Sequence, residues 1–292
     1  MARAERRPPD ARYRPFANFE DWPRVAVAAT RWDDVATRLD RQRSQAPPHA
    51  WARVPQVVLR AATLDAANQA DETDLDVVGT EASWRQAFAT KGLPGVQALY
   101  EAEVNAHALV AEAAAAGATL TEELLLRTHE ELVASHEQYP VQYGEEIVLE
   151  AVPRGEYKKF ANYGVLHDGR KRLYAPPDRV PAEIARLTQT AAGDALTNAH
   201  PVVQAAYLLY ATDAIHPFAD GNGRTARAIA SLPLYRTVGV PVVVTPRSRL
   251  AYLTSLENYD REGPGPLVDF VFHRALETMT HAFDILTASA LS

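Results

Sequence analysis

The chain has 292 residues, 47% of them hydrophobic, and a formal net charge of −7 at pH 7. This length provides a core for one large domain or two modest ones, and the negative charge gives no reason to bind nucleic acid or an anionic membrane. The absence of cysteine excludes disulfides and thiol chemistry and fits a reducing, cytoplasmic location. No apolar run reaches the ~20 residues of a membrane span, and residues 1–14 lack the apolar core of a signal peptide. We therefore expect an alanine-rich, mainly helical cytoplasmic protein.

The first 92 residues are predicted to form an N-terminal helical lobe. Residues 32–39 have apolar side chains at helical spacing, and a second helix is expected to begin near Pro55. All four tryptophans precede residue 90, and we interpret them as the core of this lobe. Glycine and proline interrupt regular structure, so Gly92-Leu93-Pro94-Gly95 is interpreted as the junction to a second domain, residues 93–292.

The second domain is predicted to open with two helices. The alanine-rich residues 96–116 form the first, which ends at Gly117. Thr119 or Thr121 caps the second. His129 lies on the apolar face of that second helix, so we interpret it as a core histidine and not as a catalyst.

A β-hairpin is predicted next. β-type runs at residues 160–166 and 172–175 flank Asp168-Gly169, which is a hairpin-turn signal. After it, residues 201–215 are apolar nearly all around a helix, which predicts a central, buried helix. The fold class is therefore mainly α, a helical bundle with a small β-hairpin.

The C-terminal part is predicted to complete the bundle. Residues 241–246 read as a short β-like run between two prolines. Residues 250–257 and 267–283 have the pattern of closing helices.

The most informative stretch is residues 216–227, His-Pro-Phe-Ala-Asp-Gly-Asn-Gly-Arg-Thr-Ala-Arg. Pro217 disfavours a helical conformation at His216, so the central helix should end there. Gly221 and Gly223 can adopt positive φ, and Asn222 tolerates it, which lets successive N–H groups form an anion-binding nest. A helix that begins at Asn222 or Gly223 adds its positive dipole end to the same point.

The side chains of this stretch suit phosphate chemistry. Arg224 and Arg227 share one helix face, and guanidinium groups match phosphate oxygens. Asp220 is a hard oxygen ligand for Mg²⁺, and His216 can accept a proton near neutral pH. The C-terminal helix dipole is expected to raise the basicity of His216, and Phe218 is expected to pack inward. A zinc site is disfavoured because the chain has no cysteine to complete it.

These residues resemble the signature of the Fic family, His-x-Phe-x-Asp/Glu-Gly-Asn-Gly-Arg-x-x-Arg, at every specified position. The resemblance extends over about residues 95–276. It implies a Fic-type helical bundle with a hairpin flap, and an enzyme that moves AMP from ATP to a Tyr, Thr or Ser hydroxyl of a target protein.

The resemblance also implies roles for individual residues. His216 would take the proton of the target hydroxyl, Asp220 would hold Mg²⁺, and the remaining positions would bind the nucleotide. The nucleotide-binding positions are Gly221, Asn222, Gly223, Arg224 and Arg227, with Tyr252 and Asp260 near the adenine and ribose.

The flap and a preceding helix complete the resemblance. Flap residues Tyr163, Gly164, Val165 and Leu166 would pair with the target main chain, as an added β-strand does. Many Fic proteins also carry an inhibitory helix with the motif Ser/Thr-x-x-x-Glu-Gly/Asn, whose glutamate reaches the second signature arginine. Here Thr63 and Asn68 fit a degenerate form of this motif within about residues 55–70, and Ala67 replaces the glutamate. The chain is thus expected to be active without this restraint, whether Ala67 is natural or engineered.

Several alternatives stay open. Fic-type enzymes can transfer UMP, phosphocholine or a phosphate, and the site could instead be silent in a nucleotide-binding regulator. Removal of AMP relies on the glutamate that this chain lacks. The partners expected are protein targets, with self-modification and oligomer formation compatible with the sequence and no nucleic acid or membrane partner.

Overall fold

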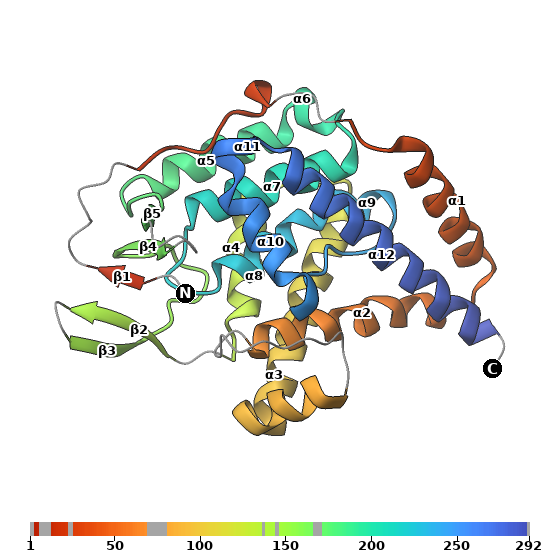
Figure 1. Cartoon of the computed structure of the whole chain (residues 1–292), viewed down its shortest axis with the longest axis horizontal. Coiled ribbons are helices and arrows are strands. Elements are labelled where there is room, and N and C mark those ends of the chain that lie inside the picture. Colours follow the sequence, from red (N-terminus) through yellow and green to blue (C-terminus); the bar gives the residue numbers. More distant parts are fainter. Residues whose placement is uncertain are drawn as a thin grey trace.

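The computed structural model describes residues 3–5, 13–22, 26–68, 81–135, 138–143, 146–165 and 171–290. Figure 1 shows a bundle of helices with the strands gathered along one edge. In chain order the elements are β1 (Arg3–Glu5), η1 (Phe19–Asp21), α1 (Ala29–Gln45), α2 (Pro48–Asn68), α3 (Glu81–Ala115), α4 (Glu122–Leu132), β2 (Gln138–Tyr143), β3 (Glu146–Ala151), β4 (Ala161–Val165), β5 (Lys171–Leu173), α5 (Val180–Ala192), α6 (Asp194–Thr197), α7 (Pro201–Ile215), α8 (Asn222–Ala230), α9 (Leu232–Thr237), η2 (Pro246–Ser248), α10 (Arg249–Glu257), α11 (Tyr259–Glu262) and α12 (Gly265–Ala290). None of the helices in these ranges is long and apolar enough to cross a membrane.

Two antiparallel hairpins make up most of the sheet. β2 pairs with β3, and β4 pairs with β5. β1 lies between the hairpins, parallel to β2 and antiparallel to β4, which gives the order β3-β2-β1-β4-β5. The predicted hairpin around Asp168-Gly169 is confirmed as β4–β5, with its turn outside the described residues. The first hairpin was not predicted, because Pro140 inside β2 is a residue that argues against a strand.

Helix α7 is the centre of the bundle. Almost all of its side chains are buried, and its neighbours include α8, α9 and α12. The helix begins where expected, because Pro201 needs no N–H partner in the first turn and His200 Nδ1 accepts the N–H of Val202. The helix ends at the buried Ile215, so the signature stretch begins inside the core at the next residue, His216. The predicted mainly α bundle with a hairpin is therefore confirmed.

Helices α2 and α3 are longer than predicted. Helix α2 begins at Pro48 and contains Pro55, rather than beginning at Pro55. Helix α3 runs continuously through residues 92–95, where a junction was predicted. In both places tertiary packing outweighs local propensity, because buried Val54 of α2 and Val96 of α3 anchor each helix beside its proline. The division of the chain at residue 92 into two domains stays a prediction.

Residues 241–245 have no regular secondary structure and Pro246 begins η2, so the predicted β-like run is not a strand. Its main chain is bonded to side chains of neighbouring helices instead of to another strand. Val242 N donates to Ser231 Oγ at 2.9 Å, and Arg274 Nε donates to Val243 O at 2.9 Å. The β-type composition reflects burial between helices, which periodicity alone does not distinguish from a strand.

Aromatic residues from the N-terminal region pack against α7 and α12, in the core that also supports the signature stretch. The Trp22 ring lies 5.1 Å from Tyr207 of α7, edge to face. Trp32 of α1 is 4% exposed, and its ring lies 6.5 Å from Phe272 of α12. The stability of the signature region should therefore depend on these tryptophans.

Replacing Trp32 tests this dependence. Trp32→Ala should lower the free energy of unfolding by about 3–5 kcal/mol, because it leaves a large cavity between α1 and α12. Leu250→Ala, at a side chain that is 76% exposed, is the matched control and should change stability by less than about 0.5 kcal/mol. Urea titration followed by circular dichroism provides the comparison. Equal midpoints for the two variants would mean that α1 does not belong to the cooperative core.

Candidate functional site

The signature stretch forms a tight loop between α7 and α8. His216 follows the last residue of α7 with φ +52°, and it is the one non-glycine residue with positive φ in the part of the chain described above. Gly221 has φ +76° and caps the start of α8 at Asn222. The predicted helix end, loop and helix start are confirmed, although Gly223 adopts an ordinary helical conformation. The left-handed turn at His216 costs about 1–2 kcal/mol, so neighbouring groups must stabilise it.

The carbonyl groups of this loop are bonded to β4 and to the segments that flank the β4–β5 hairpin. The bonds run from Ala175 N to Ile215 O (3.2 Å), from Lys158 Nζ to His216 O (2.7 Å), from Lys158 N to Pro217 O (2.9 Å) and from Asn162 Nδ2 to Phe218 O (3.1 Å). Four consecutive carbonyls are therefore satisfied from one side. Because these bonds fix the peptide planes, the same segments set the backbone path that carries His216 into the site.

Phe218 and Asn222 fix the loop from within. Phe218 is fully buried and stacks on His129 of α4, with ring centroids 3.7 Å apart, as its predicted inward packing requires. His129 Nε2 also bonds to Asp220 O at 3.0 Å, and its Nδ1 accepts the N–H of Gly155. His129 is thus a core histidine, as predicted, and it also supports the loop.

The side chain of Asn222 differs from its expected role. Its Oδ1 accepts the N–H of Phe218 and its Nδ2 donates to the Phe218 carbonyl, both at 2.8 Å. The side chain is therefore a brace inside the loop. A contribution of Asn222 to phosphate binding would come from its main-chain N–H at the start of α8.

His216 is held at its ring as well as at its main chain. Its Nδ1 lies 3.2 Å from the Asp213 carbonyl, and its ring stacks on Tyr174 with centroids 3.7 Å apart and planes 8° from parallel. A carbonyl only accepts, so Nδ1 carries the proton and Nε2 keeps its lone pair. The residue is 8% exposed. This tautomer suits Nε2 to accept a proton from a substrate hydroxyl.

The basicity of His216 is opposite to the prediction. Burial, and then the nearby Lys158 ammonium, lower the pKa of His216 well below its ordinary value, and the bond to Asp213 only partly opposes them. The helix dipole was expected to raise this pKa. Removal of the imidazolium from water is the largest cause of the lowered pKa, so burial favours the neutral ring.

The two signature arginines are both buried but have different surroundings. Arg224 Nη1 donates to Leu132 O of α4 at 2.6 Å, and burial lowers its guanidinium pKa while Glu103 of α3 acts in the opposite direction. The guanidinium carbon of Arg227 lies 5.9 Å from the ring centroid of Tyr252. The structure therefore brings Arg227 and Tyr252 together. Asp260 lies in α11, and its side chain is outside the described residues.

The β4–β5 hairpin lies directly beside His216. Gly164 of β4 passes over Tyr174 so closely that a Cβ there would be 2.6 Å from the Tyr174 hydroxyl oxygen. Arg172 of β5 pairs with Asp213 of α7, with 3.7 Å between nitrogen and oxygen. Of the predicted flap residues, Tyr163 and Gly164 are buried, whereas Leu166 and the Val165 side chain lie outside the described residues.

The degenerate inhibitory motif falls at the end of α2. Thr63 is fully buried, and its hydroxyl donates to Leu59 O within the helix at 3.1 Å. The side chains of Ala67 and Asn68 lie outside the described residues. The structure thus places this motif on a helix, as predicted, and its relation to Arg227 stays a prediction.

A magnesium ion could be held here only together with phosphate. In the described part of the chain no group of three His, Asp or Glu side chains could hold a metal. Asp220, which is partly exposed at the loop, offers one carboxylate. Mg²⁺ commonly binds through one or two carboxylates, substrate phosphates and water, so this donor set fits a nucleotide-bridged ion and not a metal cage.

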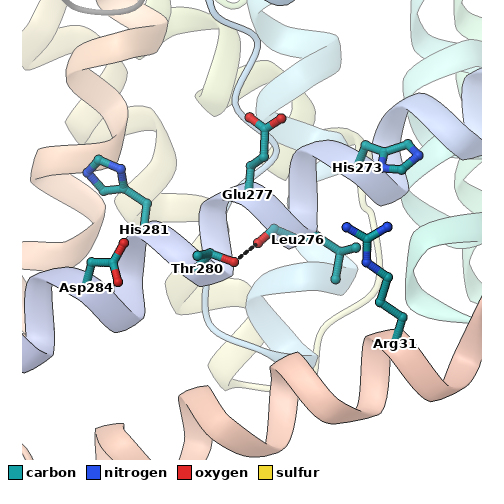
Figure 2. A pocket seen from close by; sticks show the side chains of 7 residues that line it. All are labelled: Arg31, His273, Leu276, Glu277, Thr280, His281 and Asp284. Atoms are coloured by element: carbon teal, nitrogen blue, oxygen red, sulfur yellow. Dashed lines mark hydrogen bonds between the residues drawn. The ribbon is translucent and has the colours of Figure 1, made fainter.

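A surface hollow between α1 and α12 does not belong to this site. Figure 2 shows it lined by Arg31 of α1 and by α12 residues such as His273, Glu277 and His281. It contains no residue of the signature loop, and charges of both signs surround it. We therefore assign the functional site to the loop between α7 and α8.

Comparison with known proteins relates part of the chain to a described family. Residues 119–234 match the model of the Fic/DOC family. The segment includes α4, both hairpins, α7 and α8. The comparison therefore identifies a Fic-type segment within the chain.

Relatives in sequence match a small part of their own length. The protein adenylyltransferase Fic of Drosophila persimilis is 39% identical over 72 residues, which are 25% of this chain and 14% of that protein. The protein adenylyltransferase fic-1 of Caenorhabditis briggsae is 30% identical over 95 residues, 32% of this chain and 19% of that protein. The chain thus matches less than a fifth of the length of these relatives.

Solved structures extend the likeness in fold to most of the chain. A Fic domain containing signaling protein from Bacteroides thetaiotaomicron has a TM-score of 0.67 at 20% identity, covering 88% of this chain and 97% of that chain. Fic-1 from Caenorhabditis elegans has a TM-score of 0.62 at 16% identity, covering 90% and 74%. These likenesses establish the Fic fold.

Sequence reasoning did not find the residues that hold His216. Lys158, Asn162 and Tyr174 lie 42 to 58 positions before it, in a segment without helical periodicity. Only the contact with Asp213 had some basis in the sequence, because carbonyl groups in the last turn of a helix lack intrahelical partners and are expected to accept other hydrogen bonds. The other contacts depend on tertiary structure alone.

The glycines of the loop provide a matched pair for testing its conformation. Gly221→Ala should destabilise the protein by about 1–3 kcal/mol, because φ is +76° and the new Cβ would lie 2.7 Å from Val133 Cγ1. Gly223→Ala should change stability by about 1 kcal/mol or less, because that position is helical and the nearest atom is 3.4 Å away. Thermal unfolding of both variants is the measurement. A Gly221→Ala protein as stable as Gly223→Ala would contradict the left-handed turn.

Proposed function

We propose that this protein is an AMP transferase that moves AMP from ATP to a hydroxyl side chain of a target protein. The observation that carries the proposal is the position of His216, whose Nδ1 lies 3.2 Å from the Asp213 carbonyl, at the entrance to a loop that ends in a helix N-terminus. A proton acceptor beside an anion-binding helix start suits attack of a hydroxyl on a phosphate. The adenylyltransferase names of the sequence relatives support AMP as the group moved.

In the proposed reaction, His216 Nε2 takes the proton of the target hydroxyl. The hydroxyl oxygen forms a bond to the α-phosphorus of ATP, and the bond from that phosphorus to the bridging oxygen of pyrophosphate breaks. The electron pair leaves with pyrophosphate, and the proton stays on the imidazole until it passes to water. The low pKa of His216 keeps the ring unprotonated before the reaction, so that it is ready to accept.

The remaining residues of the site would bind and orient the donor. The N–H groups at the start of α8 would contact phosphate oxygens, and Arg227 beside Tyr252 would face the leaving pyrophosphate. Asp220 would hold Mg²⁺, which supplies positive charge to the phosphates when bound. Catalysis would then rest on positioning and charge stabilisation.

The target would bind along the β4–β5 hairpin. β4, which holds the predicted flap residue Tyr163, lies inside the sheet between β1 and β5. β5 lies at the edge, so the added strand would pair with its outer side instead. The hairpin also contacts the His216 region through Arg172 and Tyr174. A peptide paired with this edge would pass close to the imidazole, which supports a protein as the acceptor.

Labelled donors separate this function from the other reactions known for Fic-type enzymes. Incubation with α-labelled and γ-labelled ATP, followed by mass spectrometry, should show AMP on a hydroxyl side chain and release of pyrophosphate. Transfer of the γ-label would indicate phosphate transfer instead. Labelled UTP and CDP-choline in parallel test UMP and phosphocholine. Nucleotide binding without any transfer would identify a silent regulator.

Two substitutions distinguish an effect on the transfer step from an effect on nucleotide binding. His216→Ala should lower AMP transfer by about 10²–10⁴-fold, with Mg²⁺·ATP affinity changed only a few-fold, because it removes the proton acceptor. Asp220→Ala should weaken Mg²⁺-dependent ATP binding, measured by calorimetry with and without the ion. Near wild-type transfer by His216→Ala would contradict the role of His216 as the proton acceptor. An unaltered Mg²⁺ dependence in Asp220→Ala would contradict the role of Asp220 as the metal ligand.

The inhibitory motif provides a regulatory prediction. Ala67→Glu should suppress self-labelling with α-labelled ATP, because a carboxylate at the end of α2 would pair with the Arg227 guanidinium and compete with the nucleotide. Ala67→Gln is the matched control, since it has nearly the same size and no charge, and it should retain activity. Equal activity of the two variants would show that residues 63–68 are an ordinary packing helix.

A further inference from the structure

Lys158 is a buried lysine directly behind the catalytic loop. Lys158 is only 3% exposed, although lysine is among the residues least often buried. The ammonium donates to Asn162 Oδ1 at 2.6 Å and to the His216 carbonyl at 2.7 Å. Its main-chain N–H donates to the carbonyl of the next residue, Pro217. A charge in this place is costly, so its partners indicate a specific task.

We propose that Lys158 is a positioning residue for the transfer reaction, which holds His216 in its left-handed turn and couples the hairpin to the catalytic loop. This inference rests on the proposed function for its effect on the rate. Its effect on the His216 ring itself does not depend on that function.

The geometry supports a positioning role. A left-handed turn aims the carbonyl of His216 away from the helix, where it would have no intrahelical partner. Lys158 supplies that partner, and Asn162 fixes the ammonium while its own amide binds the Phe218 carbonyl. Because Lys158 lies three residues before β4 and Asn162 lies in β4 itself, a shift of the hairpin would move the same bonds that hold His216.

The charge of Lys158 gives it a second effect on His216. Burial lowers the pKa of its ammonium to about 7. As the pH falls below neutral, Lys158 therefore takes up its proton first, and the new charge opposes protonation of His216. The ionisable groups that face His216 come from each neighbouring element: Lys158 before β4, Arg172 of β5, Tyr174 after β5, Asp213 of α7 and Asp220 of the loop.

Among these groups the balance favours a neutral ring. Lys158 and Arg172 lower the pKa of His216, whereas the Asp213 carbonyl bond and Asp220 raise it. Loss of the Lys158 charge should thus allow His216 to protonate at a higher pH. The acid limb of the pH–rate profile should move upward toward the ordinary histidine pKa near 6.5. A residue that only fills space would not move that limb.

The experiment compares four forms of the full chain. They are the wild type, Lys158→Met, which keeps the size without the charge, Lys158→Arg, which keeps the charge, and Lys159→Met, a control at an adjacent exposed lysine. Self-labelling with α-labelled ATP is measured from acid to neutral pH. In parallel, the pKa of His216 is followed by NMR of histidine-labelled protein, which requires no activity.

Lys158→Met should lower the maximal rate by on the order of 10²-fold, with the ATP KM nearly unchanged, because displacement of the base by about 1 Å has that effect. Its His216 pKa should rise, whereas Lys158→Arg and Lys159→Met should keep it low. An unchanged rate and His216 pKa in Lys158→Met would overturn the inference. If no form transfers AMP, the proposed function fails, and the NMR comparison still decides the role of Lys158.

Folding of the variants is checked by thermal unfolding. Should Lys158→Met not fold, Lys158→Arg decides the outcome, because arginine remains charged but cannot place a single ammonium between the two oxygens. We then expect a reduced maximal rate, with the acid limb at its wild-type pH. A limb shifted toward the ordinary histidine range, or an undiminished rate, would contradict the proposal.

Discussion

Four consecutive carbonyl groups, from Ile215 to Phe218, accept hydrogen bonds from β4 and from the segments that flank the β4–β5 hairpin. The rest of the site depends on this contact. It compensates a left-handed turn at His216 that the chain would otherwise avoid. It also explains why a hairpin distant in sequence lies beside the loop, since the same segments enter and leave the sheet.

The consequences for His216 follow from burial. A histidine at the end of a helix in water would be stabilised as the imidazolium, and the sequence suggested this outcome. Here the ring lies between the core and Tyr174, with an ammonium behind its main chain. Desolvation is the largest cause that lowers the His216 pKa, and the Asp213 carbonyl favours the proton on Nδ1. The surroundings of His216 thus favour a neutral ring in which Nε2 is the nitrogen able to accept a proton.

Much of this architecture could be predicted from the sequence, because the informative signals were local. The apolar helix at residues 201–215, the β4–β5 hairpin and the glycine-rich loop are each indicated by a pattern within a few residues of sequence. The signature also led to the Fic family, whose fold the structure has. The failures were those of long-range packing. Helix α3 crosses residues 92–95 because its neighbours hold it, and Pro140 lies in a strand that pairing stabilises.

The support of the site could not be predicted for the same reason. Nothing in the sequence near Lys158 indicates that its ammonium would meet the carbonyl of a residue 58 positions later. Asn222 matched the family pattern, yet its side chain braces the loop. A sequence signature thus indicates which residues lie together at a site, and the structure is needed to show which of their atoms are available to a substrate.

The tautomer and charge of His216 provide the most direct test of this account. ¹⁵N NMR of histidine-labelled protein distinguishes the imidazolium from each neutral tautomer. At about pH 6, where an ordinary histidine is largely protonated, the account predicts a neutral His216 with hydrogen on Nδ1 and none on Nε2. A charged ring at that pH, or a neutral ring with its hydrogen on Nε2, would contradict it.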